Sequence, residues 1–550
     1  MLEKESMTTD ILIIGSGIAG MIAAIEARKG GARVTIATKG SLGKEASTAV
    51  ARTFRTYHGD EIGGREVPGY DDEPGKHIED WAMVHAIIDE AEKQIQNLIK
   101  MGVPMVYKSS HAIYEKMPVW RPEGSDNAHG GAIVLDILAP VVRQMGVEVV
   151  EGCQMVNLLK DEGRVAGASG LRRDGRWLSI YARAVILATG GAAGMSEVAS
   201  APREIAGNGY AMALKAGLPL KNVEFNQFYP VGLPTPTGQY VHCAPLTLMM
   251  EQAVLKNDKS EDIIKKHFGL SVQDAMAVSS IRFDWLPRGV ALELEKGKVW
   301  LDLTRVPAAE WDKLPERNWK QIRRTQVDMK KTPLPVMPLS HAFRGGLLVS
   351  PRMQTPMQGL YAAGEVTAGW MAGERGLGNL PSCLAMGAIA ARNAVADMEG
   401  VKSPRQAGVV DDGLEEAQGL AKAKGRTSPV EAGDEIRRVM YRHAGPVKSS
   451  TSLQEGLREL DRLEAGASEY LCSRAEELKD GLETKAMLLA GRAIMKAALM
   501  RTESRGGFYR RDFPHRNDKE WLRPVLVSYD RASGEVRAEP GGKLVLPKSL

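Results

Sequence analysis

The sequence predicts an α/β fold, in which a Rossmann-like dinucleotide-binding domain carries an inserted α+β capping domain and is followed by a C-terminal helical bundle and a small terminal unit. Three observations predict this fold. A GxGxxG turn joins a short apolar run to a helical stretch near the N-terminus. Two later apolar runs, at 184–191 and 359–366, also end in glycines. From residue 428 the chain is dense in Glu, Lys, Leu and Arg at helical spacing.

The first unit is a βαβ element. Residues 10–14 (DILII) and 33–37 (RVTIA) have the pattern of short buried strands. The helix expected between them runs from Ile18 to Arg28, and Gly30-Gly31 is its stop signal. A helix that connects two buried strands in this way predicts a parallel sheet.

The turn after the first strand has the spacing of a pyrophosphate site. Gly15 permits the tight turn, Gly17 lets the backbone approach the phosphates, and Gly20 allows close packing of helix on strand. The amides at the start of the helix, at Ile18 and Ala19, face the anion. The acidic residue that a plain NAD site has at the end of the second strand is replaced by Thr38-Lys39.

The two later apolar runs extend the site. Gly190-Gly191, after AVILAT, would bring a second backbone loop near the cofactor. Gly364-Glu365, after LYAA, places a carboxylate at a strand end, where it could accept hydrogen bonds from ribose hydroxyls. Three strand-then-glycine elements in this order favour FAD over NAD, so the domain is predicted to be a Rossmann-like FAD-binding domain.

Changes in composition give the domain boundaries. The FAD-binding domain is predicted from two pieces of the chain, and a Pro- and aromatic-rich capping domain interrupts them. The polar, Ala/Gly-rich residues 401–424 are expected to be a linker or a loosely packed helix. The predicted ranges are 8–224 plus 346–400 for the FAD-binding domain, 225–345 for the capping domain, 425–510 for the helical domain and 511–550 for the terminal unit, which includes the alternating run 525–530.

Bulk composition excludes several classes of function. The formal charge is only +4 over 550 residues and the aromatic content is 5%, so nucleic-acid binding is not expected. The four cysteines, Cys153, Cys243, Cys383 and Cys472, form no CxxC pair, so an iron–sulfur cluster would have to come from a partner subunit. The charged N-terminus is not a secretory signal, and no apolar run reaches the ~18 residues of a membrane span. We therefore expect a cytoplasmic protein, with membrane contact only through partners.

At the level of motifs, the chain resembles the flavoprotein subunits of succinate dehydrogenase and fumarate reductase, a family that includes L-aspartate oxidase. The matching segments are IIGSGIAGMIAA, SLGKEAST, ATGG, IAGNGYAMALKAG, EFNQFYPVG, PLSHAFRGG, LYAAGEV, TSLQEGLRELDRLE and MRTESRGGFYRRDFPHRNDKEW. They follow the family's order over most of the chain. The resemblance adds FAD-contacting positions to those of the three glycine elements: Thr38, Lys39, Gly40, Ser47, Thr48, Thr189, Asn208, Ser382 and Leu384.

The resemblance also bears on how FAD is held. Respiratory members carry FAD on a histidine, and the corresponding position here is Ser47. Serine cannot form the histidyl bond, so the resemblance implies noncovalent FAD. Because the covalent bond normally raises the flavin potential, this site is expected to work at a lower potential than a succinate oxidase.

In the family, a hydride passes between flavin N5 and the carbons of a dicarboxylate. His341, in SHAFRGG, matches the second substrate histidine, whereas Tyr229 stands where the first histidine is found. Glu251 matches a family acid, but Met250 replaces the neighbouring hydroxyl residue and Val254 replaces the arginine partner, so the proton relay of fumarate reductases is expected to be broken.

Three positions concern arginine. Spacing favours Arg282 as the family's proton-donating arginine, whereas the local string favours Arg288, and the choice stays open. Arg375, in GERGLG, is displaced by one residue from the family's carboxylate-binding arginine. Arg344, in HAFRGG, is an extra positive charge that could bind a substrate anion or a flavin anion, or point outward.

These departures leave three hypotheses open. The first is an enzyme that exchanges a hydride with an organic acid or thioester other than fumarate. The second is an FAD subunit that relays electrons between iron–sulfur partner proteins without a substrate of its own. The third is an L-aspartate oxidase-like enzyme, which the Met250 substitution disfavours. The Arg-rich segment from Arg501 to Arg516 is expected either to face a partner or to be a solvated surface.

Overall fold

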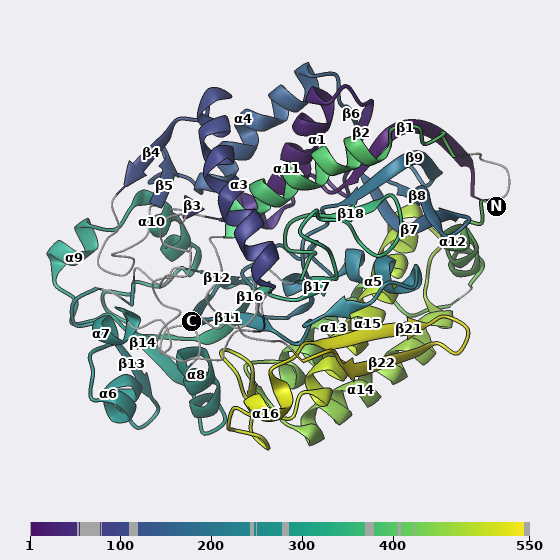
Figure 1. The fold of residues 1–550 in the computed structure, drawn as a ribbon. Coiled ribbons are helices and arrows are strands. Elements are labelled where there is room, and N and C mark those ends of the chain that lie inside the picture. Colours follow the sequence, from purple (N-terminus) through teal and green to yellow (C-terminus); the bar gives the residue numbers. More distant parts are fainter. Residues whose placement is uncertain are drawn as a thin grey trace.

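The computed structural model describes residues 2–51, 54–55, 78, 80–108, 119–242, 247–248, 250–277, 285–368, 379–404, 409–423 and 425–543. Within these ranges the predicted parts of the fold are present, and Figure 1 shows them around one central sheet. The sheet and its helices lie above the C-terminal helices, and the inserted segment projects to one side.

The central sheet has seven strands in the order β6-β2-β1-β9-β8-β7, with β18 paired to β9 as well. Its parallel part confirms the predicted βαβ unit, because β1 lies between β2 and β9 with all three running in one direction. The 11-residue strand β9 uses its first half to pair with β8 and its last residues to pair with β18. The strands are β1 (Lys4–Ile14), β2 (Val34–Ala37), β6 (Glu148–Val150), β7 (Cys153–Asp161), β8 (Arg164–Arg172), β9 (Trp177–Leu187) and β18 (Leu360–Ala362).

Helices cover this sheet on both sides. One group gathers above it in Figure 1 and comprises α1 (Ile18–Lys29), α3 (Trp81–Lys100), α4 (Gly130–Gln144) and α11 (Asn379–Asp397). On the other side, α5 (Asn208–Lys215) lies next to the C-terminal helices. Nine of the twelve residues of α1 are buried, which explains its Ala- and Ile-rich sequence. Beside α4 are the short helix α2 (Ser47–Val50) and a small sheet of β3 (Phe54–Arg55), β5 (Val119–Pro122) and β4 (Met105–Lys108).

The inserted segment has a hydrophobic core of its own, centred on residues such as Val231, Leu255 and Trp311. One of its sheets contains β12 (Tyr240–Val241), β11 (Asn226–Pro234) and β16 (Met337–Phe343), and the other contains β13 (Val254–Asn257), β14 (Val299–Asp302) and β15 (Leu334–Pro335). Its helices are α6 (Ile263–Phe268), α7 (Val272–Ala277), α8 (Leu286–Leu294), α9 (Ala308–Asp312) and α10 (Glu316–Arg324). Strands β11 and β16 are the first and last of the segment, so they connect it to the central domain.

The C-terminal region is helical, as predicted, and comprises α13 (Pro429–His443), α14 (Ser450–Ala465) and α15 (Ala475–Met500). Within the polar stretch 401–424, α12 (Asp412–Lys422) is firmly docked, because the Asp411 carboxylate accepts hydrogen bonds from Ser169 and from the Trp177 indole on the central sheet. Two short strands, β19 (Val447–Lys448) and β20 (Tyr509–Arg510), pair with each other, and the short helix α16 (Asp518–Trp521) follows.

The terminal strand unit is present but does not form a sheet of its own. Its hairpin consists of β21 (Val525–Asp530) and β22 (Glu535–Pro540), and β21 pairs with β10 (Leu220–Lys221), which in turn pairs with β17 (Gly346–Leu347). The terminal hairpin therefore belongs to the sheet that contains β10, just before the inserted segment, and β17, just after it. None of the helices in the described ranges is long and apolar enough to cross a membrane.

Candidate active site

A large cavity lies where the parallel strands end, between the central domain and the base of the inserted segment. Its empty volume is about 1410 Å³, part of it open to solvent. Its lining joins segments that are far apart in sequence: 14–19, 37–40, 45–48, 50–51, 153–155, 188–190, 200–201, 204–205, Asn208, 341–344, 363–365, Leu380 and Cys383.

The GxGxxG turn has the geometry that its sequence predicts. Gly15 has φ +111°, and a Cβ atom there would lie 2.2 Å from the carbonyl oxygen of Ala188. A Cβ atom on Gly20 would lie 2.1 Å from the carbonyl oxygen of Gly15, so Gly20 packs the helix against the turn. A Cβ atom on Gly17 would be only in ordinary contact with Thr48, so the fold does not need this glycine, although an approaching phosphate would.

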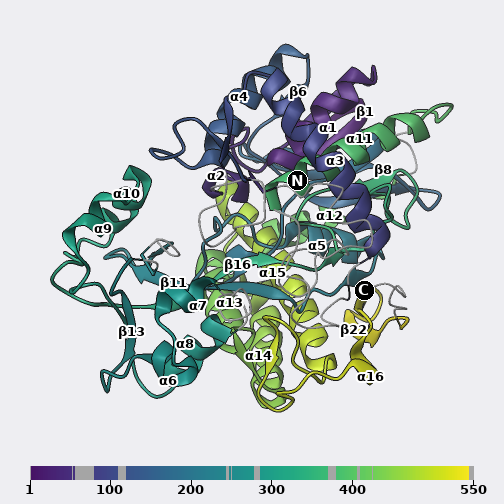
Figure 2. The same cartoon turned by 60° about the vertical axis from the view of Figure 1, so that its left-hand side comes forward.

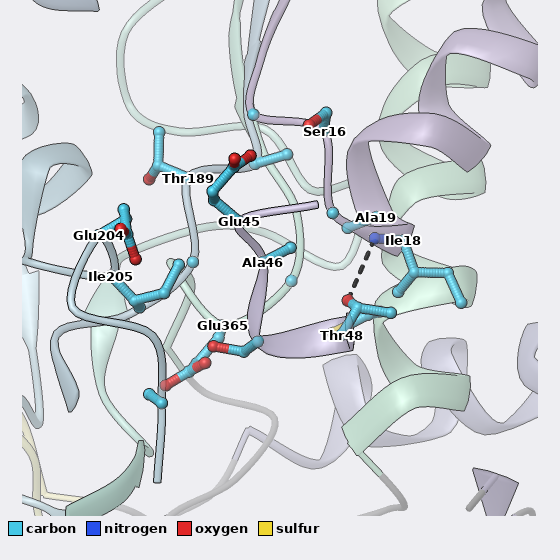
Figure 3. A pocket seen from close by; sticks show the side chains of 18 of the residues that line it. Ser16, Ile18, Ala19, Glu45, Ala46, Thr48, Thr189, Glu204, Ile205 and Glu365 are labelled. Carbon is cyan, nitrogen blue, oxygen red and sulfur yellow. Dashed lines mark hydrogen bonds between the residues drawn. The ribbon is translucent and has the colours of Figure 1, made fainter. Parts of the chain in front are cut away.

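The N-terminus of α1 faces the cavity, and side-chain hydroxyl groups of neighbouring residues fix its position by hydrogen bonds. The Ile18 amide donates to Thr48 Oγ1 at 3.3 Å, as Figure 3 shows. The hydroxyls of Ser16 and Thr38 lie 2.9 Å apart and join the turn to the end of β2. Lys39 Nζ is held by Glu483 on α15 at 2.6 Å and by Asn208 at 3.1 Å. The positions predicted to contact FAD from the first two strands therefore meet at one place.

Several buried polar atoms here have no hydrogen-bond partner among the described residues, and they test whether the cavity suits FAD. All four of the following belong to positions predicted to contact FAD: Ser47 Oγ, Thr189 Oγ1, Asn208 Nδ2 and Ser382 Oγ. An unsatisfied buried donor or acceptor costs about 1–3 kcal/mol, so such groups are retained where a ligand satisfies them. FAD offers phosphate oxygens, hydroxyl groups and ring carbonyls to them, so these residues fit the cofactor.

Two other residues predicted to contact FAD are packed closely against neighbouring parts of the protein. Leu384 is fully buried in α11, and Gly191 lies against the Glu365 side chain, where a Cβ atom would be 2.3 Å from Oε1. Gly40, Gly190 and Gly364 line the cavity itself.

Glu365 is the carboxylate at the end of β18, and Figure 3 shows it at the wall of the cavity. Oε1 accepts a hydrogen bond from the Phe343 amide at 2.9 Å. Burial raises the pKa of Glu365 to about 7, although hydrogen bonds from the Phe343 and Gly191 amides and the positive charge of Arg344 oppose the rise. The carboxyl group can therefore gain or lose a proton near neutral pH.

At the end of the cavity under the inserted segment, His341 lines the wall and is the first of three neighbouring rings. His341 lies beside Tyr229, with ring centroids 4.0 Å apart, and Tyr229 lies parallel to His242, with centroids 4.1 Å apart and an interplanar angle of 9°. Nδ1 of His341 is 2.8 Å from the Ser200 hydroxyl, which fixes the orientation of this imidazole. Strands β11 and β16 pair directly at this point, so Tyr229 and His341 come together although they are 112 positions apart in the chain.

Arg344 points inward and not toward solvent. It is 5% exposed and lines the same end of the cavity. Its guanidinium donates to the side-chain oxygen of Gln227, and its backbone amide donates to the Phe225 carbonyl at 2.8 Å. Of the uses considered from the sequence, an outward-pointing surface arginine is excluded, and the two anion-binding uses remain.

Other predicted site residues lie elsewhere. Glu251 is exposed at the start of the turn before β13, and its amide contacts the Glu310 carboxylate, which does not suit a buried proton relay. The Arg288 guanidinium lies 4.5 Å from the centre of the Tyr509 ring, at the contact between α8 and the C-terminal region. Arg282, Arg375 and Cys243 fall outside the described residues.

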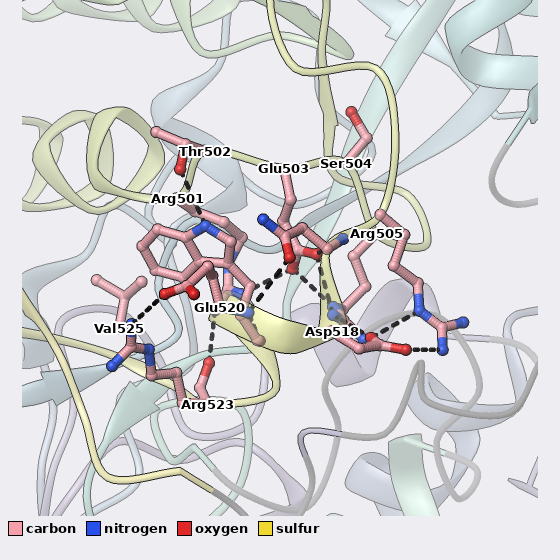
Figure 4. A network of polar contacts seen from close by, with 12 residues as sticks. Arg501, Thr502, Glu503, Ser504, Arg505, Asp518, Glu520, Arg523 and Val525 are labelled. Atoms are coloured by element: carbon pink, nitrogen blue, oxygen red, sulfur yellow. Dashed lines mark hydrogen bonds and ion pairs between the residues drawn. The ribbon is translucent and has the colours of Figure 1, made fainter.

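Within the Arg-rich segment 501–516, three arginines are buried and fit neither predicted use, whereas residues 511–515 are exposed. Arg501, Arg505 and Arg510 are among the most deeply buried side chains described. Arg501 Nε is 2.7 Å from Glu224, and Arg501 and Arg505 share Glu503, as Figure 4 shows. These arginines are therefore internal charges that join the C-terminal segment to the residues before β11.

Two residues of the site escaped the sequence analysis. His242 directly follows the strand that pairs with β11, and this hairpin position, not Glu251, meets Tyr229. Counting along the hairpin from Tyr229 would have pointed to it. No pattern in the sequence predicted a role for Ser200. It lies beside His341 because an isolated β-bridge joins residues 199 and 340, which are far apart in the sequence.

Comparison with known proteins agrees with the geometry. The family model of the FAD binding domain matches residues 10–380, and that of the fumarate reductase flavoprotein C-terminal region matches residues 433–541. The chain therefore belongs to the FAD-dependent oxidoreductases of the fumarate reductase and succinate dehydrogenase flavoprotein family.

Individual relatives cover nearly the whole chain. An uncharacterized FAD-dependent oxidoreductase of Methanocaldococcus jannaschii is 29% identical over 95% of this chain and 96% of its own length. A CoM/CoB fumarate reductase subunit from Methanothermobacter marburgensis is 27% identical, with 96% and 98% covered. The L-aspartate oxidase of Streptomyces coelicolor is also 27% identical, with 95% and 92% covered.

Solved structures confirm the fold. The flavoprotein of Escherichia coli quinol fumarate reductase superimposes with a TM-score of 0.85 at 20% identity, covering 99% of this chain and 98% of that one. Mycobacterium smegmatis Sdh1 superimposes with a TM-score of 0.81 at 25% identity, with 99% and 96% covered.

Proposed function

We propose that this FAD-dependent oxidoreductase exchanges a hydride with an organic acid or thioester other than fumarate, and that it holds FAD noncovalently. The stack of His341, Tyr229 and His242 at the end of the FAD cavity carries the proposal. When bound, FAD supplies hydride exchange at its ring nitrogen N5. The protein's own residues must then hold the substrate carbons and its acid group at this end.

Tyr229 changes what this end can bind. A phenol donates one hydrogen bond but carries no positive charge, whereas two carboxylates in a closed site need charged donors. His341 lines the cavity, and Tyr229 lies beside it with ring centroids 4.0 Å apart, so an uncharged phenol is the neighbour of the lining histidine. One anionic group next to an apolar or thioester segment suits this arrangement better than the two carboxylates of fumarate.

The proton donor is proposed to be Arg282. Spacing to the end of α8 favours it, and the contact between Arg288 and the Tyr509 ring gives Arg288 another use. His341, held by Ser200, would orient the acid group of the substrate, and Arg375 is the further candidate for its carboxylate.

The test uses the isolated full-length chain loaded with FAD. Dithionite-reduced dye is offered as electron donor, first with fumarate and then with a crotonyl-type thioester as acceptor. The proposal expects oxidation of the dye with the thioester and much less with fumarate. Fast fumarate reduction would contradict it.

Noncovalent FAD rests on Ser47, whose hydroxyl has no partner among the described residues and cannot form a histidyl bond. Precipitation with acid should leave the protein colourless and release yellow FAD into the supernatant. A yellow precipitate would refute this part of the proposal.

A second candidate is an electron-relay protein that works with an iron–sulfur partner. The exposed position of Glu251 favours it, because a reductase that takes protons from solvent needs an inward relay. The Methanothermobacter relative is named as one part of a larger reductase, which also favours a multi-chain assembly. Co-purification with an iron–sulfur protein, together with no turnover by the isolated chain on any acceptor, would support the relay. An L-aspartate oxidase activity is the third candidate, and production of hydrogen peroxide from L-aspartate would identify it.

A further inference from the structure

Two charged side chains, Arg344 and Glu365, face one end of the FAD cavity. The direction in which FAD lies follows from the fold. In a Rossmann-like domain the pyrophosphate lies on the first turn, and the end of the second strand lies beside the adenosine ribose. Here that strand ends at Thr38 and Lys39. The opposite end, which Arg344 and Glu365 share with His341, therefore receives the flavin ring.

The backbone holds Arg344 firmly at this position. It precedes Gly345 and Gly346, where a Cβ atom would lie 2.0 Å from the Asn222 carbonyl oxygen and 2.2 Å from that of Val366. This close approach locks the end of β16 between two neighbouring segments. The Tyr210 hydroxyl also donates to the Gly345 carbonyl at 2.7 Å. The arginine is therefore presented from rigid backbone.

The orientation of the guanidinium is set by a neutral group. Its guanidinium donates to the side-chain oxygen of Gln227, which is itself buried, and its positive charge also acts on the carboxyl group of Glu365. Among the described residues that line the cavity, the only lysine and arginine are Lys39 and Arg344. Lys39 lies at the other end, paired with Glu483, so among the described lining residues Arg344 is the cation nearest to the proposed position of the ring.

We propose that Arg344 sets the reduction potential of the noncovalently bound flavin, in place of the covalent bond that Ser47 cannot make. When two electrons and one proton enter FAD, the ring gains one negative charge. A buried cation stabilises that charge more strongly than one in water, because the surroundings have a low dielectric constant. Arg344 therefore raises the potential, and the carboxylate of Glu365 lowers it.

The experiment measures flavin potential with no organic substrate present, so its outcome is independent of which substrate the enzyme uses, although the proposal rests on noncovalent FAD. The FAD-loaded chain is titrated with dithionite beside a reference dye, and absorbance gives the ratio of reduced to oxidised flavin. In Arg344→Met this ratio should fall at least tenfold at a given dye potential, which is about 30 mV for a two-electron couple. Arg344→Lys should retain most of the wild-type ratio.

The matched control is Arg352→Met. Arg352 is paired with Asp397 at the surface, away from the FAD cavity, so the ratio should stay at the wild-type value. A ratio in Arg344→Met equal to that of the control would overturn the proposal. If Arg344→Met does not retain FAD, Glu365→Gln supplies the opposite measurement, because removal of the negative charge should raise the ratio. An unchanged or lower ratio in Glu365→Gln would likewise overturn it.

Discussion

The two ends of the cavity are built in different ways. At the pyrophosphate end, the backbone makes the site: a Cβ atom on Gly15 or Gly20 would lie 2.2 or 2.1 Å from a carbonyl oxygen, so only glycine fits at either position. At the opposite end, side chains from distant segments make it: His341 from β16, Tyr229 from β11 and His242 after β12. The backbone end suits a cofactor shared by a whole family, and the side-chain end is the part that we propose sets the substrate.

The largest effect is expected at the backbone end. Gly15→Ala would place Cβ against the Ala188 carbonyl at a positive φ, so the turn must move and FAD retention should be lost. Gly31→Ala is the matched control, because Gly31 also has a positive φ, +84°, but nothing lies within 4 Å of its Cβ position. Flavin absorbance after gel filtration measures retention. If both variants retained the same amount of FAD, the contact of the new Cβ atom with the Ala188 carbonyl would not be what determines FAD binding.

The next largest effect is expected for the buried ion pair next to β11, which supports the side-chain end of the cavity. Arg501→Met leaves Glu224, which lies just before β11, without its buried partner, and should cost about 3–5 kcal/mol in the free energy of unfolding. Arg176→Met, which breaks an exposed pair with Asp174, should leave the free energy of unfolding nearly unchanged. Urea unfolding followed by circular dichroism measures both. If the double variant Arg501→Met/Glu224→Gln were no more stable than Arg501→Met, the buried carboxylate would not be the cause.

Substitution of His341 should lower turnover without changing the affinity for FAD. His341→Ala should lower turnover of the accepted substrate by about a hundredfold, the range for a lost positioned acid–base or donor group. FAD affinity, measured by flavin fluorescence titration, should remain at the wild-type value. Ser200→Ala, which removes the hydroxyl 2.8 Å from Nδ1, should give a smaller loss. A parallel loss of FAD in His341→Ala would mean that the two ends are not independent.

The effect that is smallest over a single pH unit is a dependence of stability on pH. The folded-state pKa of Glu365, about 7, lies above its ordinary value of 4.5, so the folded FAD-free chain binds more protons than the unfolded chain between these values. Its contribution to stability is therefore greatest below about pH 4.5 and is lost as the pH rises to about 7, by at most about 1.4 kcal/mol per pH unit. Glu365→Gln should remove this slope from urea unfolding of the FAD-free chain. A slope identical to the wild type would contradict the shifted pKa.

The cofactor half of the molecule could be predicted from the sequence because its determinants are local. A strand, a glycine turn and a helix within residues 10–28 are enough to place Gly15, Gly17 and Gly20, and the glycines after β9 and β18 follow the same rule. The helical texture after residue 428 predicted α13 to α15 for a similar reason, since helical spacing is set within a few turns.

The rest depended on packing between distant segments. Arg501 meets Glu224 across 277 positions, and this burial turned an expected surface into an internal network. The hairpin of β11 and β12 brought His242 to Tyr229, whereas Glu251 remained exposed. The sequence by itself determined the FAD-binding fold, because backbone geometry needs glycine at particular places. Only the tertiary structure decided which charged and aromatic side chains come together at the other end of the cavity, because pairing between segments is fixed by how strands and helices pack and not by their local sequence.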